Sequence, residues 1–175
     1  MKTILVVLLF ASSVFGQDDA AARSAAGCGA DQVNFDVKTE KKLHPAPHPQ
    51  ADKALIYVFQ DVKGNDLGFG VMSVTARVGL DGAWVGAISN KSYFFFSADP
   101  GDHRLCTNWQ SSVASRSKLA SAASLTAEAG KSYYFRTKVY SIRRGQLAMK
   151  LEALDSIEAQ LLMASFSFST SSPKK

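Results

Sequence analysis

Three histidines are the residues of this chain whose chemistry first suggests a metal or acid–base site. His44 and His48 stand four residues apart, the spacing of one helix face, but the Pro-Ala-Pro between them excludes a helix. We therefore expect an exposed linker there and no metal site. His103 directly follows the turn sequence of residues 99–102 (Asp-Pro-Gly-Asp). A hydrogen bond to the backbone of that turn is its expected role.

Enzyme motifs are missing from the sequence. It contains no GxSxG, no HExxH and no Walker loop, and Gly68-Phe69-Gly70 lacks the third glycine of a dinucleotide-binding loop. We predict that the chain is not an enzyme, and we assign it no catalytic residue and no cofactor. The alternative is a hydrolase whose site is assembled from distant residues. A pocket that holds His103 within hydrogen-bonding reach of an aspartate and a serine would support it.

A candidate ligand-binding face comes from alternation within one predicted strand, residues 131–140. Tyr134, Arg136, Lys138 and Tyr140 fall on one face of it, because side chains alternate along a strand. Between Ala129 and Leu151 there are six basic residues and no acidic one. Such a face can bind an anionic polymer or a sugar through charge and stacking. The competing interpretation is an ordinary solvated face of a sheet.

The two cysteines, Cys28 and Cys106, form a second candidate pair. In an oxidising compartment an even cysteine count favours a disulfide. This bridge would close a loop of about 78 residues and stabilise the fold by about 4 kcal/mol in the chain-entropy model. Two buried free thiols are the alternative. Metal binding by the pair is not expected, since there is no CxxC motif or Cys/His cluster.

The first 16 residues have the layout of a signal peptide. Lys2 precedes the apolar run of residues 4–10, and Val14-Phe15-Gly16 provides a cleavage site after Gly16. The run is shorter than the roughly 20 residues that span a bilayer. We expect an exported protein, periplasmic or extracellular, with no membrane span in its mature form. Cys28 lies too far beyond the apolar run for lipidation.

The mature chain divides into a leader, one domain and a tail. Residues 17–53 form the leader, which contains Cys28, a possible edge strand at residues 33–37 and a proline-rich linker at residues 43–49. Residues 54–165 form the domain, and residues 166–175 are expected to be a flexible tail. The net charge of +5 is mild, which together with export argues against a nucleic-acid partner.

Short runs of strand-like residues fill the domain. Residues 72–80 alternate apolar and polar, and Asp81-Gly82 then predicts a hairpin turn. Residues 93–96 (Tyr-Phe-Phe-Phe) do not alternate, so both faces of that strand should be covered, one by the leader or the C-terminal segment. Residues 111–123 suggest a loop, followed by a short strand at residues 124–127.

A short helix is predicted near the C-terminus. Asp155 should cap it, and Ile157, Leu161 and Leu162 should pack on a sheet. The fold class that follows is an all-β antiparallel β-sandwich of about seven to eight strands with a short C-terminal helix.

An ordered series of segments resembles a known family. The segments are residues 54–59, 78–86, 93–96, 99–103 and 128–136. Together they resemble the bacterial exported family catalogued as domain of unknown function 2846. The resemblance implies a β-sandwich-like domain in a bacterial envelope and supplies no catalytic residues.

The expected function is therefore a non-catalytic exported envelope module with a binding or structural role. Its expected partner is an anionic envelope polymer or another envelope protein.

Overall fold

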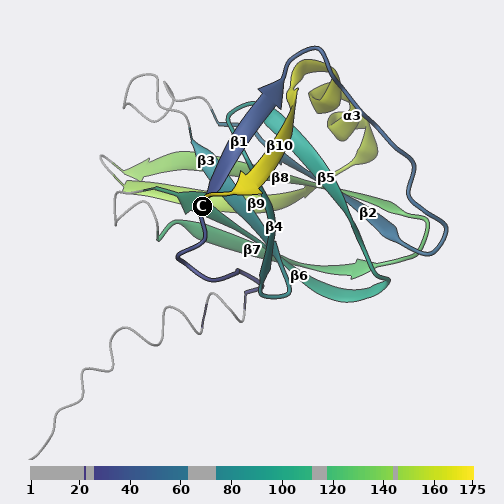
Figure 1. The fold of residues 1–175 in the computed structure, drawn as a ribbon, viewed down its shortest axis with the longest axis horizontal. Helices are drawn as coiled ribbons and strands as arrows, with labels where there is room; N and C mark the ends of the chain where they lie inside the picture. Colours follow the sequence, from purple (N-terminus) through teal and green to yellow (C-terminus); the bar gives the residue numbers. More distant parts are fainter. Residues whose placement is uncertain (1–21, 23–25, 63–73, 112–117, 144–145) are drawn as a thin grey trace, which may run out of the picture.

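The computed structural model describes residue 22 and residues 26–62, 74–111, 118–143 and 146–175. The predicted signal peptide lies outside these residues, as do residues 112–117 of the loop predicted at residues 111–123. The described chain forms two sheets that face each other across a common core, with one helix, α3, on the outside (Figure 1).

The smaller sheet has four strands in the order β4-β3-β6-β7. Its strands are β3 (Thr75–Leu80), β4 (Ala83–Ile88), β6 (Gly101–Gln110) and β7 (Ala120–Ala127). Neighbouring strands of this sheet are all antiparallel. The β3–β4 hairpin turns at Asp81-Gly82, where φ is +51° and +89°. Positive φ at both central residues is what an Asp-Gly hairpin turn requires, so the predicted hairpin is confirmed.

The larger sheet has six strands in the order β1-β10-β5-β2-β8-β9. Its strands are β1 (Phe35–Glu40), β2 (Ala54–Gln60), β5 (Ser92–Ala98), β8 (Ser132–Arg143), β9 (Gln146–Leu154) and β10 (Ser167–Pro173).

The larger sheet is mixed, which corrects the prediction of a fully antiparallel fold. β2 runs parallel to β8, and β10 runs parallel to β5. Local turn signals identify hairpins between consecutive strands, whereas these two pairs join strands separated by long stretches of chain. The chain leaves β2, builds the smaller sheet and β5, and returns as β8 in the same direction. The all-β sandwich-like class is confirmed.

The main core lies between the sheets and is filled by alternate residues of both. Ile56 and Val58 on β2 meet Ala76 and Val78 on β3, and all four are fully buried. The alternation of residues 72–80 therefore predicts correctly which side chains enter the core, from residue 74 where the structure describes it. The opposite face, expected to be solvated, is covered as well, since Arg77 is only 3% exposed.

A second apolar cluster lies on the outer face of the larger sheet. It contains Tyr57 and Tyr93, with Ala159 and Leu162 of α3 (Ser156–Ser165) packed over it. Phe94 and Phe96 of β5 instead point into the main core. Both faces of this strand are covered, as the lack of alternation at residues 93–96 predicted.

The contacts of α3 agree only in part with those predicted from the sequence. Asp155 caps the helix by accepting hydrogen bonds from the backbone N–H groups of Ile157 and Glu158, each 2.8 Å long. Ile157 and Leu161, however, are 73% and 69% exposed, so the prediction that they pack on a sheet was wrong. The helix turns Ala159, Leu162 and Met163 toward the sheet, a stripe that leaves those two residues on the opposite side.

The C-terminal residues are not a free tail, in contrast to the flexible segment predicted for residues 166–175. Phe166 and Phe168 enter the second cluster, and β10 lies between β1 and β5 in the larger sheet. The sequence did not predict this strand, because residues 169–172 (Ser-Thr-Ser-Ser) show no apolar alternation. β1 pairs with β10 at the sheet edge, close to the edge strand predicted at residues 33–37.

The leader is attached to both faces of the sandwich. Cys28 and Cys106 form a disulfide with a Cα–Cα distance of 5.1 Å, as predicted. This ties residues 26–34 to the smaller sheet, and β1 then carries the chain over to the larger sheet. The segment between β1 and β2 runs past α3 (Figure 1). No helix within the described residues is both long and apolar enough to cross a membrane.

Candidate functional site

The leader packs closely on the outer face of the smaller sheet. Arg77 on β3 donates hydrogen bonds to the carbonyls of Asp31 and Val33 (2.7 and 2.8 Å), and its guanidinium lies 4.7 Å from the centre of the Trp84 ring. At Gly27, where φ is +83°, a Cβ would lie 2.2 Å from the carbonyl oxygen of Arg104. Only glycine fits this contact, because both the conformation and the space exclude a side chain.

Beside the leader, small side chains line the outer face of β7. Leu125 and Ala127 belong to the main core, so the alternating residues Ala120, Ala122, Ser124 and Thr126 face outward. We call this outward face, with the adjoining residues of β6 and the leader, the β7 trough. Two hollows follow each other along it.

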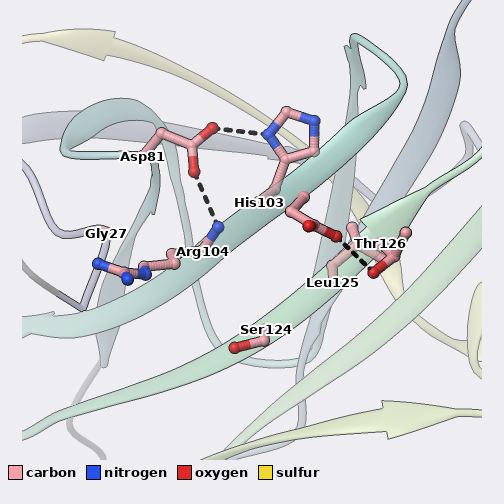
Figure 2. A pocket seen from close by; sticks show the side chains of 8 residues that line it. Gly27, Asp81, His103, Arg104, Ser124, Leu125 and Thr126 are labelled. Atoms are coloured by element: carbon pink, nitrogen blue, oxygen red, sulfur yellow. Dashed lines mark hydrogen bonds and ion pairs between the residues drawn. The ribbon is translucent and has the colours of Figure 1, made fainter.

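The first hollow has a volume of about 610 Å³ and lies at the Thr126 end (Figure 2). Asp102 accepts a hydrogen bond of 2.7 Å from the Thr126 hydroxyl across the strand pair. Arg104 lies opposite Ser124, and Gly27 of the leader forms a wall. The hollow is thus lined by hydroxyl groups, charged side chains and backbone.

His103 lies at the rim of this hollow with both ring nitrogens bonded. Nδ1 is 2.6 Å from a carboxylate oxygen of Asp81, and Nε2 is 2.8 Å from the carbonyl oxygen of Asp99. Both of these partners only accept, so both nitrogens must donate, which only the imidazolium form allows. The hydrogen bond to Asp81 raises the pKa of His103 against the effect of partial burial. The predicted bond to the turn backbone is confirmed.

Asp81 completes this arrangement as a carboxylate. Partial burial alone would raise the pKa of Asp81, but the backbone N–H of Arg104 and the His103 ring outweigh burial and lower it. The Arg104 N–H donates to the second carboxylate oxygen at 2.8 Å (Figure 2). Asp81 therefore joins the β3–β4 turn to β6 by charge-assisted hydrogen bonds.

The geometry of a serine hydrolase is not formed by these residues. His103 pairs in register with Leu125, while Ser124 pairs with Arg104, so His103 and Ser124 project from opposite faces of the sheet. A general base also needs Nε2 free to accept the serine proton, whereas here Nε2 donates to the Asp99 carbonyl.

The second hollow, of about 340 Å³, lies at the other end of the β7 trough. Ala120 and Ala122 line one side and the Cys28–Cys106 disulfide lines another, with Lys118 at the rim. The two hollows together follow β7 from Ala120 to Thr126.

The aromatic and basic face predicted on β8 is divided in the structure. Tyr134 stacks on Tyr57 with ring centroids 5.2 Å apart, whereas Tyr140 is 47% exposed near the far end of the strand. Arg136 and Lys138 both contact Glu152 on β9, at 2.6 and 2.7 Å, and Arg136 also contacts Glu158 of α3. Both acidic partners, Glu152 and Glu158, follow residues 129–151, the segment without acidic residues.

Glu152 is held as a carboxylate by its cationic neighbours. Hydrogen bonds from Lys138, Arg136 and Lys150 outweigh partial burial and lower the pKa of Glu152 to about 2. The face predicted to attract an anionic polymer therefore carries its own counter-charges.

Metal-binding geometry is not found in the described part of the chain, where no three His, Cys, Asp or Glu residues gather. His44 and His48 lie exposed in the linker between β1 and β2.

Sequence reasoning missed the β7 trough. The second half of β7 is the short strand predicted at residues 124–127, but its first half, residues 120–123, falls where a loop was predicted, because alanine is depleted in strands and runs rich in serine are typical of loops. The missed residues are Ala120, Ala122, Ser124 and Thr126. A signal was present in the alternation of small outward residues with Leu125 and Ala127, although it was too weakly apolar to distinguish from a loop.

Comparison with known proteins gives one match. Residues 50–149 match the model of a family described as Protein of unknown function (DUF2846). No curated protein and no solved structure matches the chain.

Proposed function

The chain belongs to the DUF2846 family, whose function is unknown. We propose that it is a non-catalytic exported module that binds an extended acidic polymer in the β7 trough. The observation that supports this most strongly is the alignment of the two hollows along one strand face. From Ala120 to Thr126 the trough is about 20 Å long at the usual rise per residue of a strand. This shape suits a linear chain better than a compact metabolite.

The lining groups suggest the chemical class of the polymer. Ser124 and Thr126 offer hydroxyl groups. The first hollow has two cationic side chains, His103 and Arg104, and the second has Lys118. Asp81 is paired with the His103 cation, whereas Asp102 is bonded to the neutral hydroxyl of Thr126. A polymer rich in hydroxyl groups with regularly spaced carboxylates, such as a cell-wall glycan, matches this lining.

Export is the second part of the proposal. The N-terminal sequence has the layout of a cleaved signal peptide, and the Cys28–Cys106 disulfide is typical of an oxidising compartment. A periplasmic or extracellular location would bring the module into contact with cell-envelope polymers.

Filling the trough tests the proposed site. Ala122 and Ser124 are exposed, so Ala122→Trp and Ser124→Trp should block the trough without disturbing the core. Thr39→Trp, exposed on β1 at the far edge of the larger sheet, is the matched control. In co-sedimentation with purified insoluble peptidoglycan, we expect both trough variants to lose at least tenfold in binding and the control to retain it.

Equal sedimentation of all four proteins would contradict the assignment of the site. If the wild-type protein does not bind at either low or high salt, the proposal that its ligand is a cell-wall polymer is contradicted.

Hydrolysis is the alternative function, because His103, Asp81 and Ser124 all line the first hollow, although His103 and Ser124 project from opposite faces of the sheet. The occupied Nε2 of His103 argues against it. Hydrolysis of p-nitrophenyl acetate by the wild-type protein that is abolished by Ser124→Ala would favour the alternative. We expect no hydrolysis above that of buffer.

A further inference from the structure

A proline-rich segment of the leader lies on the aromatic outer face of the larger sheet. The hydroxyl of Tyr57 donates a 2.9 Å hydrogen bond to the carbonyl of Pro47, and the hydroxyl of Tyr93 donates a 3.1 Å bond to the carbonyl of Pro45. The segment has no helix or strand hydrogen bonds of its own. It is therefore held by side chains of the sheet.

The tyrosines that hold the segment lie in a buried aromatic cluster, which we call the platform. Tyr57 and Tyr93 are 2% and 0% exposed, and Tyr57 packs against Phe95 and Tyr134 with ring centroids 5.3 and 5.2 Å away. Burial raises the pKa of both tyrosines to about 12, so each stays a hydrogen-bond donor over the physiological pH range.

This combination is the chemistry that recognises proline-rich peptides in general. Such peptides are extended and lack many backbone donors, so they dock on aromatic-lined surfaces that supply donors to their carbonyls. Here two phenols satisfy two carbonyls that are two residues apart. Pro47 is itself exposed, so the contact depends on its carbonyl and not on burial of its ring.

Most of the aromatic platform lies within the range that matches the family model, whereas the proline segment lies outside it. All four aromatic residues lie within residues 50–149, which match the DUF2846 model, whereas the proline segment precedes that range. These four residues thus belong to the family domain and the segment that lies on them belongs to the leader, while Phe166, Phe168 and α3, which complete the cluster, follow the matched range.

We propose that the face formed by Tyr57, Tyr93, Phe95 and Tyr134 is a binding surface for proline-rich peptides, with residues 43–49 as its internal occupant. A partner protein with an exposed Pro-x-Pro segment would bind by displacing that occupant. This surface lies on the opposite sheet from the β7 trough, so the proposal does not depend on the polymer hypothesis.

The internal occupant competes strongly, because a tethered segment has an effective concentration in the millimolar range. A free peptide must overcome this competition in the wild-type protein. Weakening the occupant should therefore reveal binding that the wild-type chain conceals.

The test uses the mature full-length chain and a synthetic peptide with the sequence of residues 42–50. Pro45→Ser combined with Pro47→Ser weakens the occupant, and His44→Ser combined with His48→Ser is the matched control in the same segment. By calorimetry we expect the proline variant to bind the peptide at least tenfold more tightly than the control or the wild type. Adding Tyr57→Phe and Tyr93→Phe to the proline variant should abolish that gain.

A measurement on the wild-type protein covers the case in which the proline variant does not fold. Lys41 and Lys42 are exposed at the start of the segment. Millimolar peptide should accelerate tryptic cleavage there by displacing the segment, while a peptide with alanine in place of every proline should not.

Equal affinity of the folded proline variant and the wild type, or tryptic cleavage unaffected by the peptide, would overturn the proposal. A dimer that forms in the proline variant only when Tyr57 and Tyr93 are intact would also overturn it, since it would assign the face to a second copy of the chain.

Discussion

His103 shows how a residue with catalytic potential is used for structure in this fold. It joins the Asp99–Asp102 turn to the β3–β4 turn through Asp81, at one end of the smaller sheet. The two hydrogen bonds of this link require the charged imidazolium, since a neutral ring can donate from only one nitrogen. The contribution of His103 to stability should therefore depend on pH.

The pH dependence has a definite sign. The pKa of His103 is raised in the folded state, so its stabilising contribution is complete below its ordinary value of 6.5 and is lost as pH rises through the raised value. Thermal unfolding of wild type and His103→Gln should show the largest difference in Tm near pH 6. The difference should shrink toward pH 9. A difference in Tm that is constant from pH 6 to pH 9 would show that His103 acts by packing alone.

On the larger sheet, Glu152 is an acidic residue whose contribution to stability should also depend on pH. It contacts Arg136, Lys138 and Lys150 at 2.6, 2.7 and 3.1 Å, with 21% of its side chain exposed. Since these contacts lower its pKa to about 2, its contribution is present above the ordinary value of 4.5 and is lost as pH falls toward 2.

Glu152→Gln should reduce the free energy of unfolding by about 1–2 kcal/mol at pH 7, after allowance for solvent screening. The effect should decline between pH 4.5 and pH 2. Urea unfolding at several pH values measures it, with Glu40→Gln, exposed on β1, as the control. A loss at pH 7 no greater than that of the control would mean that the cluster contributes little net stability.

At the scale of elements, the leader acts as a strap around the sandwich. The disulfide and Arg77 fix it to the smaller sheet, β1 pairs with β10, and Tyr57 and Tyr93 hold the proline segment on the larger sheet. The strap also forms one wall of both hollows of the β7 trough.

Removing the disulfide should loosen this strap. Cys28→Ser combined with Cys106→Ser is expected to cost about 2–5 kcal/mol in the free energy of unfolding, because the bridge restricts a long loop in the unfolded chain. Urea unfolding of the variant, and of the wild type with and without reductant, measures the change. A free energy unchanged by both treatments would mean that the leader docks without help from the bridge.

At the scale of the whole molecule, the parts predictable from sequence are those encoded by neighbouring residues. The β3–β4 hairpin follows from Asp81-Gly82, and the helix cap follows from Asp155. The disulfide followed from the even cysteine count together with the predicted export. Coverage of both faces of β5 followed from its unbroken apolar run at residues 93–96.

The parts that escaped prediction depend on pairing across long stretches of chain. The parallel β2–β8 and β5–β10 pairs have no local turn signal, and β10 was taken for a flexible tail. The pairing of Arg136 with Glu152 across β8 and β9 was also invisible, because Glu152 follows the acid-free segment by one residue.

The most direct test of the account is a map of where a soluble cell-wall fragment touches the isotope-labelled mature protein. A titration followed by amide chemical shifts should move the signals of Ala122, Ser124 and Thr126 together with that of Arg104, and leave those of β8 and β9 in place. Shifts that cluster on Arg136, Lys138 and Tyr140 instead would contradict the assignment of the polymer to the β7 trough and return it to the basic face of β8.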